Sequence, residues 1–234
     1  MSAANDKNQG TGGLGALLYG GLAYVAFIGS FGIYWVGFLA DRWVPITVDR
    51  RPGELLPTWQ GILVDLGLIL LFGLQHSVMA RPAFKRQWTR VVPAALERST
   101  YVLLSSVCLA LLMGFWQPWP ATLWPVAWEP ARMMLWGLFA LGLLVSVAAS
   151  FQIDHLELFG LRQAWARYRG GDCSEPRFVE PWLYRIVRHP IQAGVLLMLW
   201  SPPTMTASLP ERAPTSPPET GASRAATERS LAAS

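Results

Sequence analysis

Four long runs of apolar residues constrain this chain more than any other feature of its sequence. They cover residues 14–40, 59–79, 99–116 and 133–151, and only the second contains an Asp, Glu, Lys or Arg residue, Asp65. A helix needs about 20 apolar residues to cross a hydrocarbon core about 30 Å thick. The composition agrees, because 52% of the 234 residues are hydrophobic and only 15% are charged. The sequence therefore predicts an all-α, polytopic transmembrane helix bundle.

A fifth apolar run is shorter than the other four. Residues 191–200 are interrupted at once by Ser201, Pro202 and Pro203. A run of that length makes about 15 Å of helix, which is about half of a hydrocarbon core. We therefore expect four full spans and a partial fifth.

The two ends of the chain differ from its apolar part. Residues 1–13 are polar and rich in glycine, and about two-thirds of residues 207–234 are Ala, Ser, Pro or Thr. The second composition is typical of disorder. We expect a membrane domain over residues 14–206, a polar N-terminal segment and a disordered tail. Because the tail begins where a membrane helix is expected to continue, it indicates a shifted reading frame or a shortened gene.

The distribution of positive charge predicts the topology. Residues 80–98 carry five basic residues against the single acidic Glu97, whereas residues 117–130 carry no lysine or arginine. Cytoplasmic loops are enriched in lysine and arginine, so the first segment is expected in the cytoplasm, together with the N-terminus. The net charge of +4 thus reports topology and does not indicate a nucleic-acid partner. We expect a multi-pass protein of a bacterial inner membrane.

The only three histidines of the chain fall at the same predicted face of the membrane. His76 ends a span that runs inward, His155 follows another, and His189 precedes the next entry. A site shared between helix ends requires such clustering. Asp154 and Glu157 are three residues apart and are expected on one helix face, either as part of that site or as the charged face of an interfacial helix.

Arg188, His189 and Pro190 stand where a polar loop meets the last apolar run. Proline fixes its own φ and disfavours helix at the preceding residue, so a helix is expected to begin at Pro190. The free N–H groups of a helix start and a nearby arginine both favour a carboxylate or phosphate. An anchor for lipid headgroups would show the same residues, and both interpretations stay open.

The remaining polar residues inside the spans carry weaker signals. Asp65 is an ionisable group within a predicted span, and such groups usually face the bundle interior. We expect it to hold helices together. Cys108 lies within a span and Cys173 in a polar loop, so no disulfide is expected. No cluster of thiolates or carboxylates favours a metal site.

Four ordered blocks of this sequence resemble the bacterial methanethiol S-methyltransferases, which are grouped with the nurim family and are distantly similar to the isoprenylcysteine carboxyl methyltransferases. The blocks are Phe72–Arg81, Glu97–Tyr101, His155–Gln163 and Tyr184–Gln192. The resemblance covers about residues 14–206. It implies S-adenosylmethionine as the methyl donor and a small thiol as the acceptor, with dimethyl sulfide formed from methanethiol.

The resemblance also implies roles for particular residues. The attacking species is the thiolate, so a base or a cationic environment is expected near the thiol. His155, His76 and Glu157 are the candidates, and we favour His155. The candidates for binding S-adenosylmethionine are Arg188, which would hold its carboxylate, with the polar or stacking side chains of Tyr184, His189 and Gln192.

This chain departs from the wider group of membrane methyltransferases at its end. In that group the Arg-His-Pro block works with a last helix that carries paired acidic residues, and no such helix follows Pro190 here. We therefore expect half of a donor pocket and a chain that is inactive or weakly active. The alternatives are a non-catalytic, nurim-like membrane scaffold and a haem-binding electron carrier with two histidine ligands, for which His189 before a proline is poorly placed.

Overall fold

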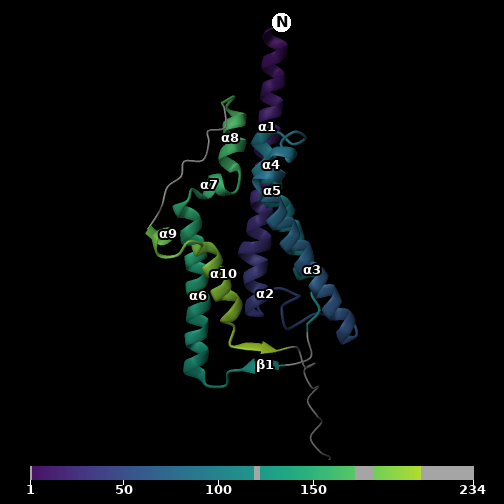
Figure 1. Cartoon of the computed structure of the whole chain (residues 1–234), viewed down its shortest axis with the longest axis vertical. Coiled ribbons are helices and arrows are strands. Elements are labelled where there is room, and N and C mark those ends of the chain that lie inside the picture. The colour runs from purple at the N-terminus through teal and green to yellow at the C-terminus, as the bar shows by residue number, and fades with distance from the viewer. Residues whose placement is uncertain (1, 119–121, 172–181, 207–234) are drawn as a thin grey trace, which may run out of the picture.

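The computed structural model describes residues 2–118, 122–171 and 182–206, and these residues are mostly helical. Figure 1 shows the long helices running lengthwise through the molecule. The elements in chain order are α1 (Ser2–Phe27), η1 (Ile28–Trp35), α2 (Val36–Ala40), α3 (Thr58–Met79), α4 (Pro82–Trp88), α5 (Ala94–Phe115), β1 (Thr122–Pro125), α6 (Glu129–Gln152), α7 (His155–Leu158), α8 (Leu161–Tyr168), α9 (Trp182–Ile186), α10 (Pro190–Trp200) and β2 (Thr204–Thr206).

Four helical stretches in the described part of the chain are long and apolar enough to cross a membrane. They are Gly13–Ala40, which joins α1, η1 and α2, and the helices α3, α5 and α6. The helix α10 is apolar as well but has only 11 residues. The predicted all-α polytopic bundle, with four full spans and a partial fifth, is confirmed.

Proline determines where the last helix begins. Pro190 occupies the first turn of α10, and His189 before it has φ −134° and lies outside the helical region. This is the start that the steric effect of proline predicts. The boundary is important for function, because it leaves Arg188 and His189 just outside the helix.

The short elements gather at the two ends of the bundle. The helices α4, α7, α8 and α9 lie toward the end from which α1 emerges, and the strands lie at the other end (Figure 1). The strands β1 and β2 form an antiparallel ribbon that ties the connection before α6 to the residues after α10. The sequence did not predict this ribbon, because strands of four and three residues carry too little pattern to be recognised.

An apolar core near the ribbon end joins the helices. Phe38 and Leu39 of α2 and Met113 of α5 are almost fully buried, and they cluster with Phe139 of α6 and Met198 of α10. Side chains buried among others lose contact with solvent or lipid and gain dispersion contacts. The cluster therefore connects α6 and α10 to the helices from the first half of the chain.

The helices α6 and α10 approach each other through small residues. A Cβ atom at Gly142 would lie 2.6 Å from the carbonyl oxygen of Gly194, and one at Gly194 would meet that of Gly142. Beside them, the Ser146 hydroxyl donates to the carbonyl of Ile191 at 3.2 Å. Small residues let membrane helices pack closely, and interhelical hydrogen bonds add to this attraction. This crossing fixes α10, and with it the residues that precede α10.

Asp65 has the structural role expected from the sequence. Its side chain is buried in α3, and one carboxylate oxygen accepts the backbone N–H of Gln117 at 2.9 Å. Gln117 follows α5, and its own side chain donates to the carbonyl of Phe115 at 3.0 Å. These bonds satisfy backbone groups at the end of α5 and attach α3 to it.

The described residues include one of the two cysteines. Cys108 is buried and free. Cys173 and the tail over residues 207–234 lie outside the described residues.

Candidate functional site

The candidate site begins with His155, which opens the short helix α7 directly after α6. Asp154 precedes it with φ 70°, and the Asp154 carboxylate accepts the backbone N–H of Glu157 at 3.2 Å. Asparagine and aspartate tolerate this left-handed conformation and are favoured as N-cap residues. The tight turn brings the imidazole back beside the end of α6.

Aromatic rings enclose the His155 imidazole. Phe151 stacks on it with ring centroids 4.3 Å apart and an angle of 7° between the planes. Phe159 meets it edge to face at 4.7 Å, and the ring of Tyr24 from α1 meets it in a T-shaped arrangement at 5.6 Å. The enclosure fixes the orientation of the imidazole and limits its access to solvent.

Two hydroxyl groups determine the tautomer of His155. The Ser150 hydroxyl donates to the carbonyl of Val147 at 2.7 Å, so its oxygen accepts at its other contact, from Nδ1 of His155 at 2.9 Å. A neutral imidazole with its proton on Nδ1 has a lone pair on Nε2. The Tyr24 hydroxyl, 2.8 Å from Nε2, therefore donates to it. In this arrangement the unprotonated nitrogen of the neutral imidazole faces a phenol.

Burial lowers the pKa of His155 below its usual value of 6.5, and the charge of Asp154 opposes this effect. The phenol of Tyr24 on α1 and the carboxylate of Asp154 are the titratable groups that contact or influence the ring. Desolvation penalises the charged form of a group, so the folded protein favours the neutral imidazole.

This pKa gives a testable pH dependence of stability. Below pH 6.5 the unfolded chain binds a proton at His155 that the folded chain resists, so stability falls as pH decreases from 6.5 through the lower folded pKa. We expect the thermal unfolding midpoint in detergent to fall more steeply over that range for the wild type than for His155→Phe. Equal slopes for the two proteins would contradict a depressed pKa at His155.

Asp154 and Glu157 form an acidic pair. Arg162 of α8 contacts Asp154 at 2.6 Å and Glu157 at 3.7 Å, so both carboxylates face one guanidinium group, although Asp154 is the N-cap of α7 and lies outside the helix. The Glu157 side chain is largely buried, and its Oε1 atom has no hydrogen-bond partner among the described residues. One acceptor of Glu157 thus remains open.

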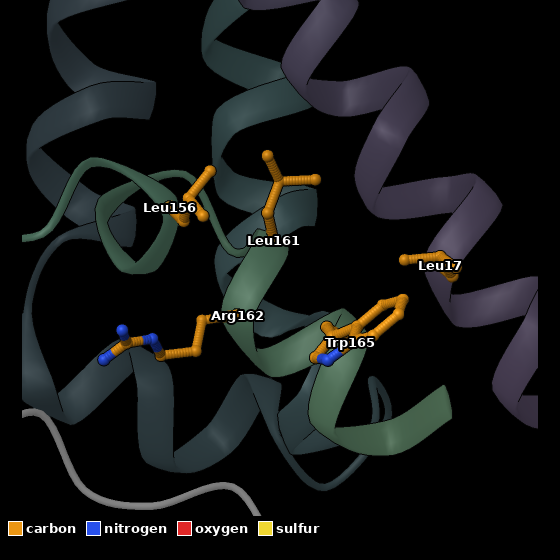
Figure 2. A pocket seen from close by; sticks show the side chains of 5 residues that line it. All are labelled: Leu17, Leu156, Leu161, Arg162 and Trp165. Atoms are coloured by element: carbon orange, nitrogen blue, oxygen red, sulfur yellow. The ribbon is translucent and has the colours of Figure 1, made fainter. Parts of the chain in front are cut away.

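A cavity of about 370 Å³ adjoins this pair, between α1 and the helices α7 and α8. Figure 2 shows Leu17, Leu156, Leu161 and Trp165 around it, with the guanidinium group of Arg162 extending away from Trp165. Its lining is mostly apolar. The cavity offers room beside the acidic pair but few polar contacts for a ligand.

Gly160 fixes the turn from α7 to α8 against α5. Its φ is 83°, and a Cβ atom there would lie 2.6 Å from the Ser99 hydroxyl oxygen. Both the backbone conformation and the close approach require glycine. The turn places Phe159 against Val102 and Ala23, so α1, α5 and α7 meet at the site.

His76 lies away from His155, on α3. The Tyr101 hydroxyl of α5 is 3.0 Å from the His76 ring, and Phe72 stacks on the same ring with centroids 5.4 Å apart. Tyr101 also packs against the cluster that contains Phe159. Tyr101 therefore links His76 on α3 to the cluster that contains Phe159.

The candidate donor-binding residues surround the start of α10. Tyr184 lies in α9, Arg188 and His189 in the link, and Gln192 in the first turn of α10. The side chains of Arg188, His189 and Gln192 are exposed, and no carboxylate within the described ranges pairs with Arg188. Burial raises the pKa of the half-buried Tyr184, which therefore stays a neutral phenol.

A hydrogen bond ties this group to the end of α6. The side chain of Gln152, which lies three residues before His155, accepts the backbone N–H of Leu183 at 3.3 Å. Within the described part of the chain, no hydrogen bond or ion pair joins His155 itself to the four candidate donor-binding residues. The structure thus brings His155 and Glu157 onto one short helix, with the donor-binding candidates beside the end of α6 and His76 farther away.

Sequence reasoning missed the partners of His155. Tyr24 is 131 residues away in the chain, and nothing in its apolar span indicates a polar contact. Ser150 and Phe151 are close in sequence, but serine and phenylalanine are common in membrane helices. Arg162 lies in the block His155–Gln163, but the resemblance gave it no role. Its spacing of five residues from Glu157 was the only signal in the sequence for their contact.

Long apolar helices joined by short amphipathic elements define a multi-pass helical membrane protein. Comparison with known proteins identifies its family. Over 191 residues the chain is 47% identical to the methanethiol S-methyltransferase of Mycobacterium tuberculosis, covering 82% of this chain and 77% of the relative. It is 46% identical over 194 residues to methanethiol S-methyltransferase 2 of Bradyrhizobium diazoefficiens, covering 83% and 73%. The chain belongs to the methanethiol S-methyltransferase family.

A eukaryotic protein is similar as well. Nurim of Xenopus laevis is 36% identical over 205 residues, which cover 79% of this chain and 70% of that protein. No family model matches the chain. No solved structure matches it.

Proposed function

We propose that this chain transfers a methyl group from S-adenosylmethionine to methanethiol, forming dimethyl sulfide. The observation that carries the proposal is the 47% identity, over 82% of the chain, to a protein named for this methyl transfer. The arrangement of polar side chains at one end of the bundle supports it, because a neutral base and an exposed arginine both lie there.

The start of α10 suits the methyl donor. S-adenosylmethionine carries a carboxylate, and the exposed guanidinium of Arg188 lies just before the free N–H groups of α10. Tyr184 supplies a neutral phenol as a hydrogen-bond donor, and His189 and Gln192 supply further polar groups. In the proposed complex these residues hold and orient the donor.

His155 suits the removal of the thiol proton. Methyl transfer forms a new carbon–sulfur bond on methanethiol while the carbon–sulfur bond of the sulfonium breaks, so the thiol proton must leave. Nε2 of His155 accepts the hydrogen bond of the Tyr24 hydroxyl. When the Tyr24 oxygen takes up the proton of the thiol, the proton that Tyr24 held passes to His155. Glu157 and His76 remain the other candidate bases.

The proposed orientation places this end of the bundle in the cytoplasm. Residues 80–98 carry five basic residues, and α4 lies at the same end as α7 and α9 (Figure 1). Positive loops face the cytoplasm. We propose a location in a bacterial inner membrane with the N-terminus inside.

The test is product formation by membranes that contain the chain. With S-adenosylmethionine and methanethiol added, gas chromatography should detect dimethyl sulfide, and omission of either compound should abolish it. Membranes from the same cells without the chain are the control. Absence of product from correctly inserted protein would reject the proposal and favour a non-catalytic scaffold.

A further inference from the structure

The short helix α8 packs against the beginning of the first membrane span, which starts at Gly13. The two helices touch through small residues. A Cβ atom at Gly13 would lie 2.9 Å from the Cα atom of Tyr168, and one at Gly20 would lie 2.8 Å from the Cβ atom of Ala164. Close contacts of this kind hold membrane helices together. The last turn of α8 is therefore fixed level with the start of the span, where the membrane surface is expected.

Two arginines at this end of α8 have no acidic partner. Arg167 and Arg169 are exposed, and neither forms an ion pair with another described residue. Arg162 at the other end of α8 differs, because it contacts both Asp154 and Glu157. The last turn of α8 thus carries two positive charges that the described part of the chain leaves unneutralised.

An aromatic pair accompanies these arginines. The guanidinium carbon of Arg169 lies 5.4 Å from the centroid of the Trp165 ring, in a cation–π contact. The ring of Tyr168 lies 5.6 Å from that of Trp165, and both rings are exposed. Tryptophan and tyrosine are enriched at the level of lipid headgroups. The contact keeps the Arg169 guanidinium close to the rings at that level.

The apolar cavity of about 370 Å³ between α1 and α8 begins at the same tryptophan. Its lining includes Leu17 from the span, Leu161 and Trp165. Figure 2 shows Leu17 and Trp165 pointing toward one another. Because Trp165 is exposed, the cavity opens to the outside of the bundle. An apolar recess thus lies beside two free cations, and a lipid likewise joins an acyl chain to a charged headgroup.

We infer that α8 binds one anionic phospholipid, and we call this place the α8 lipid site. The lipid phosphate contacts Arg167 and Arg169, and an acyl chain lies in the cavity against Leu17 and Trp165. Arginine binds phosphate through charge-assisted hydrogen bonds. A headgroup with a net negative charge complements the two arginines, whereas a zwitterionic headgroup carries a compensating cation. The inference does not depend on methyl transfer.

The α8 lipid site adjoins the elements that carry the candidate base. Arg162 joins α8 to Asp154 and Glu157, on either side of His155. A ligand that binds only the folded state stabilises it. We therefore expect phosphatidylglycerol to raise the thermal unfolding midpoint in detergent, and phosphatidylcholine to raise it less.

Native mass spectrometry of the purified chain tests the site directly. The chain in detergent is mixed with phosphatidylglycerol or with phosphatidylcholine of the same acyl chains, and the bound lipid is counted. We expect the first phosphatidylglycerol to bind at least about fivefold more tightly, because one arginine near an anionic headgroup contributes about that factor. Equal affinities for the two lipids would overturn the inference.

Arg169→Gln and Arg86→Gln form a matched pair. Both remove one exposed arginine from the same end of the bundle, but Arg86 belongs to α4. We expect Arg169→Gln to weaken binding of the first phosphatidylglycerol about fivefold and Arg167→Gln to weaken it further when added. Arg86→Gln should match the wild type. Equal losses in Arg169→Gln and Arg86→Gln would mean that the whole basic face attracts anionic lipid, and would contradict a site on α8.

A second pair of variants tests the cavity. Leu17→Trp fills the cavity with a large ring, whereas Leu18→Trp adds the same ring at an exposed position outside its lining. Only Leu17→Trp should weaken phosphatidylglycerol binding. Wild-type binding by Leu17→Trp would overturn the inference, and the arginine variants keep it testable if Leu17→Trp does not fold.

Glycerol 3-phosphate separates a lipid from a free phosphate. It carries the phosphate of the headgroup but has no acyl chain for the cavity, so an excess of about a hundredfold should leave phosphatidylglycerol bound. Displacement of the lipid would mean that the arginines bind phosphate alone, and would contradict a lipid site.

Discussion

Replacing His155 with phenylalanine is expected to reduce dimethyl sulfide formation at least about a hundredfold, because general-base catalysis typically contributes that much or more. Phenylalanine retains a ring between Phe151 and Phe159 but has no nitrogen to accept the proton of Tyr24. The expected loss falls mainly on kcat. The measurement is the steady-state rate in membranes with matched amounts of protein, with methanethiol and S-adenosylmethionine varied in turn.

Two further variants make this result specific. Tyr24→Phe removes the hydroxyl that donates to Nε2 and should share much of the loss if the proton passes through it. Leu156→Ala changes an exposed neighbour in the same short helix and should leave kcat unchanged. If His155→Phe keeps most of the wild-type rate, the base lies elsewhere, and Glu157 with its open Oε1 atom becomes the next candidate.

The parts of the fold that the sequence predicted depend on local physical rules. The spans follow from the length and apolarity of the runs, and the start of α10 follows from the sterics of Pro190. The structural role of Asp65 follows from the cost of leaving a carboxylate without partners in a membrane. Each of these rules depends only on residues that are close in the sequence or on the surrounding solvent.

The parts that the sequence did not predict depend on packing between distant segments. The Tyr24–His155 bond and the Tyr101–His76 contact depend on which helices become neighbours. The ribbon of β1 and β2 depends on two short segments meeting at one end of the bundle. The π-helical segment η1 has the same apolar composition as an ordinary helix, so hydropathy gives no signal for it.

Replacing Gly194 with valine is expected to detach α10 from α6. The new Cβ atom would collide with the Gly142 carbonyl oxygen and lie 2.9 Å from the Ser146 backbone nitrogen. Both are backbone groups of a long helix, so they cannot rotate away as a side chain can, and overpacking of this kind typically costs about 1–3 kcal/mol or more. We expect a lower thermal unfolding midpoint in detergent and a large rise in the KM for S-adenosylmethionine.

The rise in KM is expected because α10 positions the donor site. Arg188 and His189 are held by the start of α10 at one side and by the bond from Gln152 to Leu183 at the other. Once Ser146 no longer holds the carbonyl of Ile191, the first turn of α10 loses its hydrogen bond to α6, and the residues before α10 keep the bond from Gln152 to Leu183. Leu196→Val introduces the same residue at an exposed position of α10 and is the control. A normal midpoint together with a normal KM in Gly194→Val would show that the α6–α10 crossing does not position the donor site.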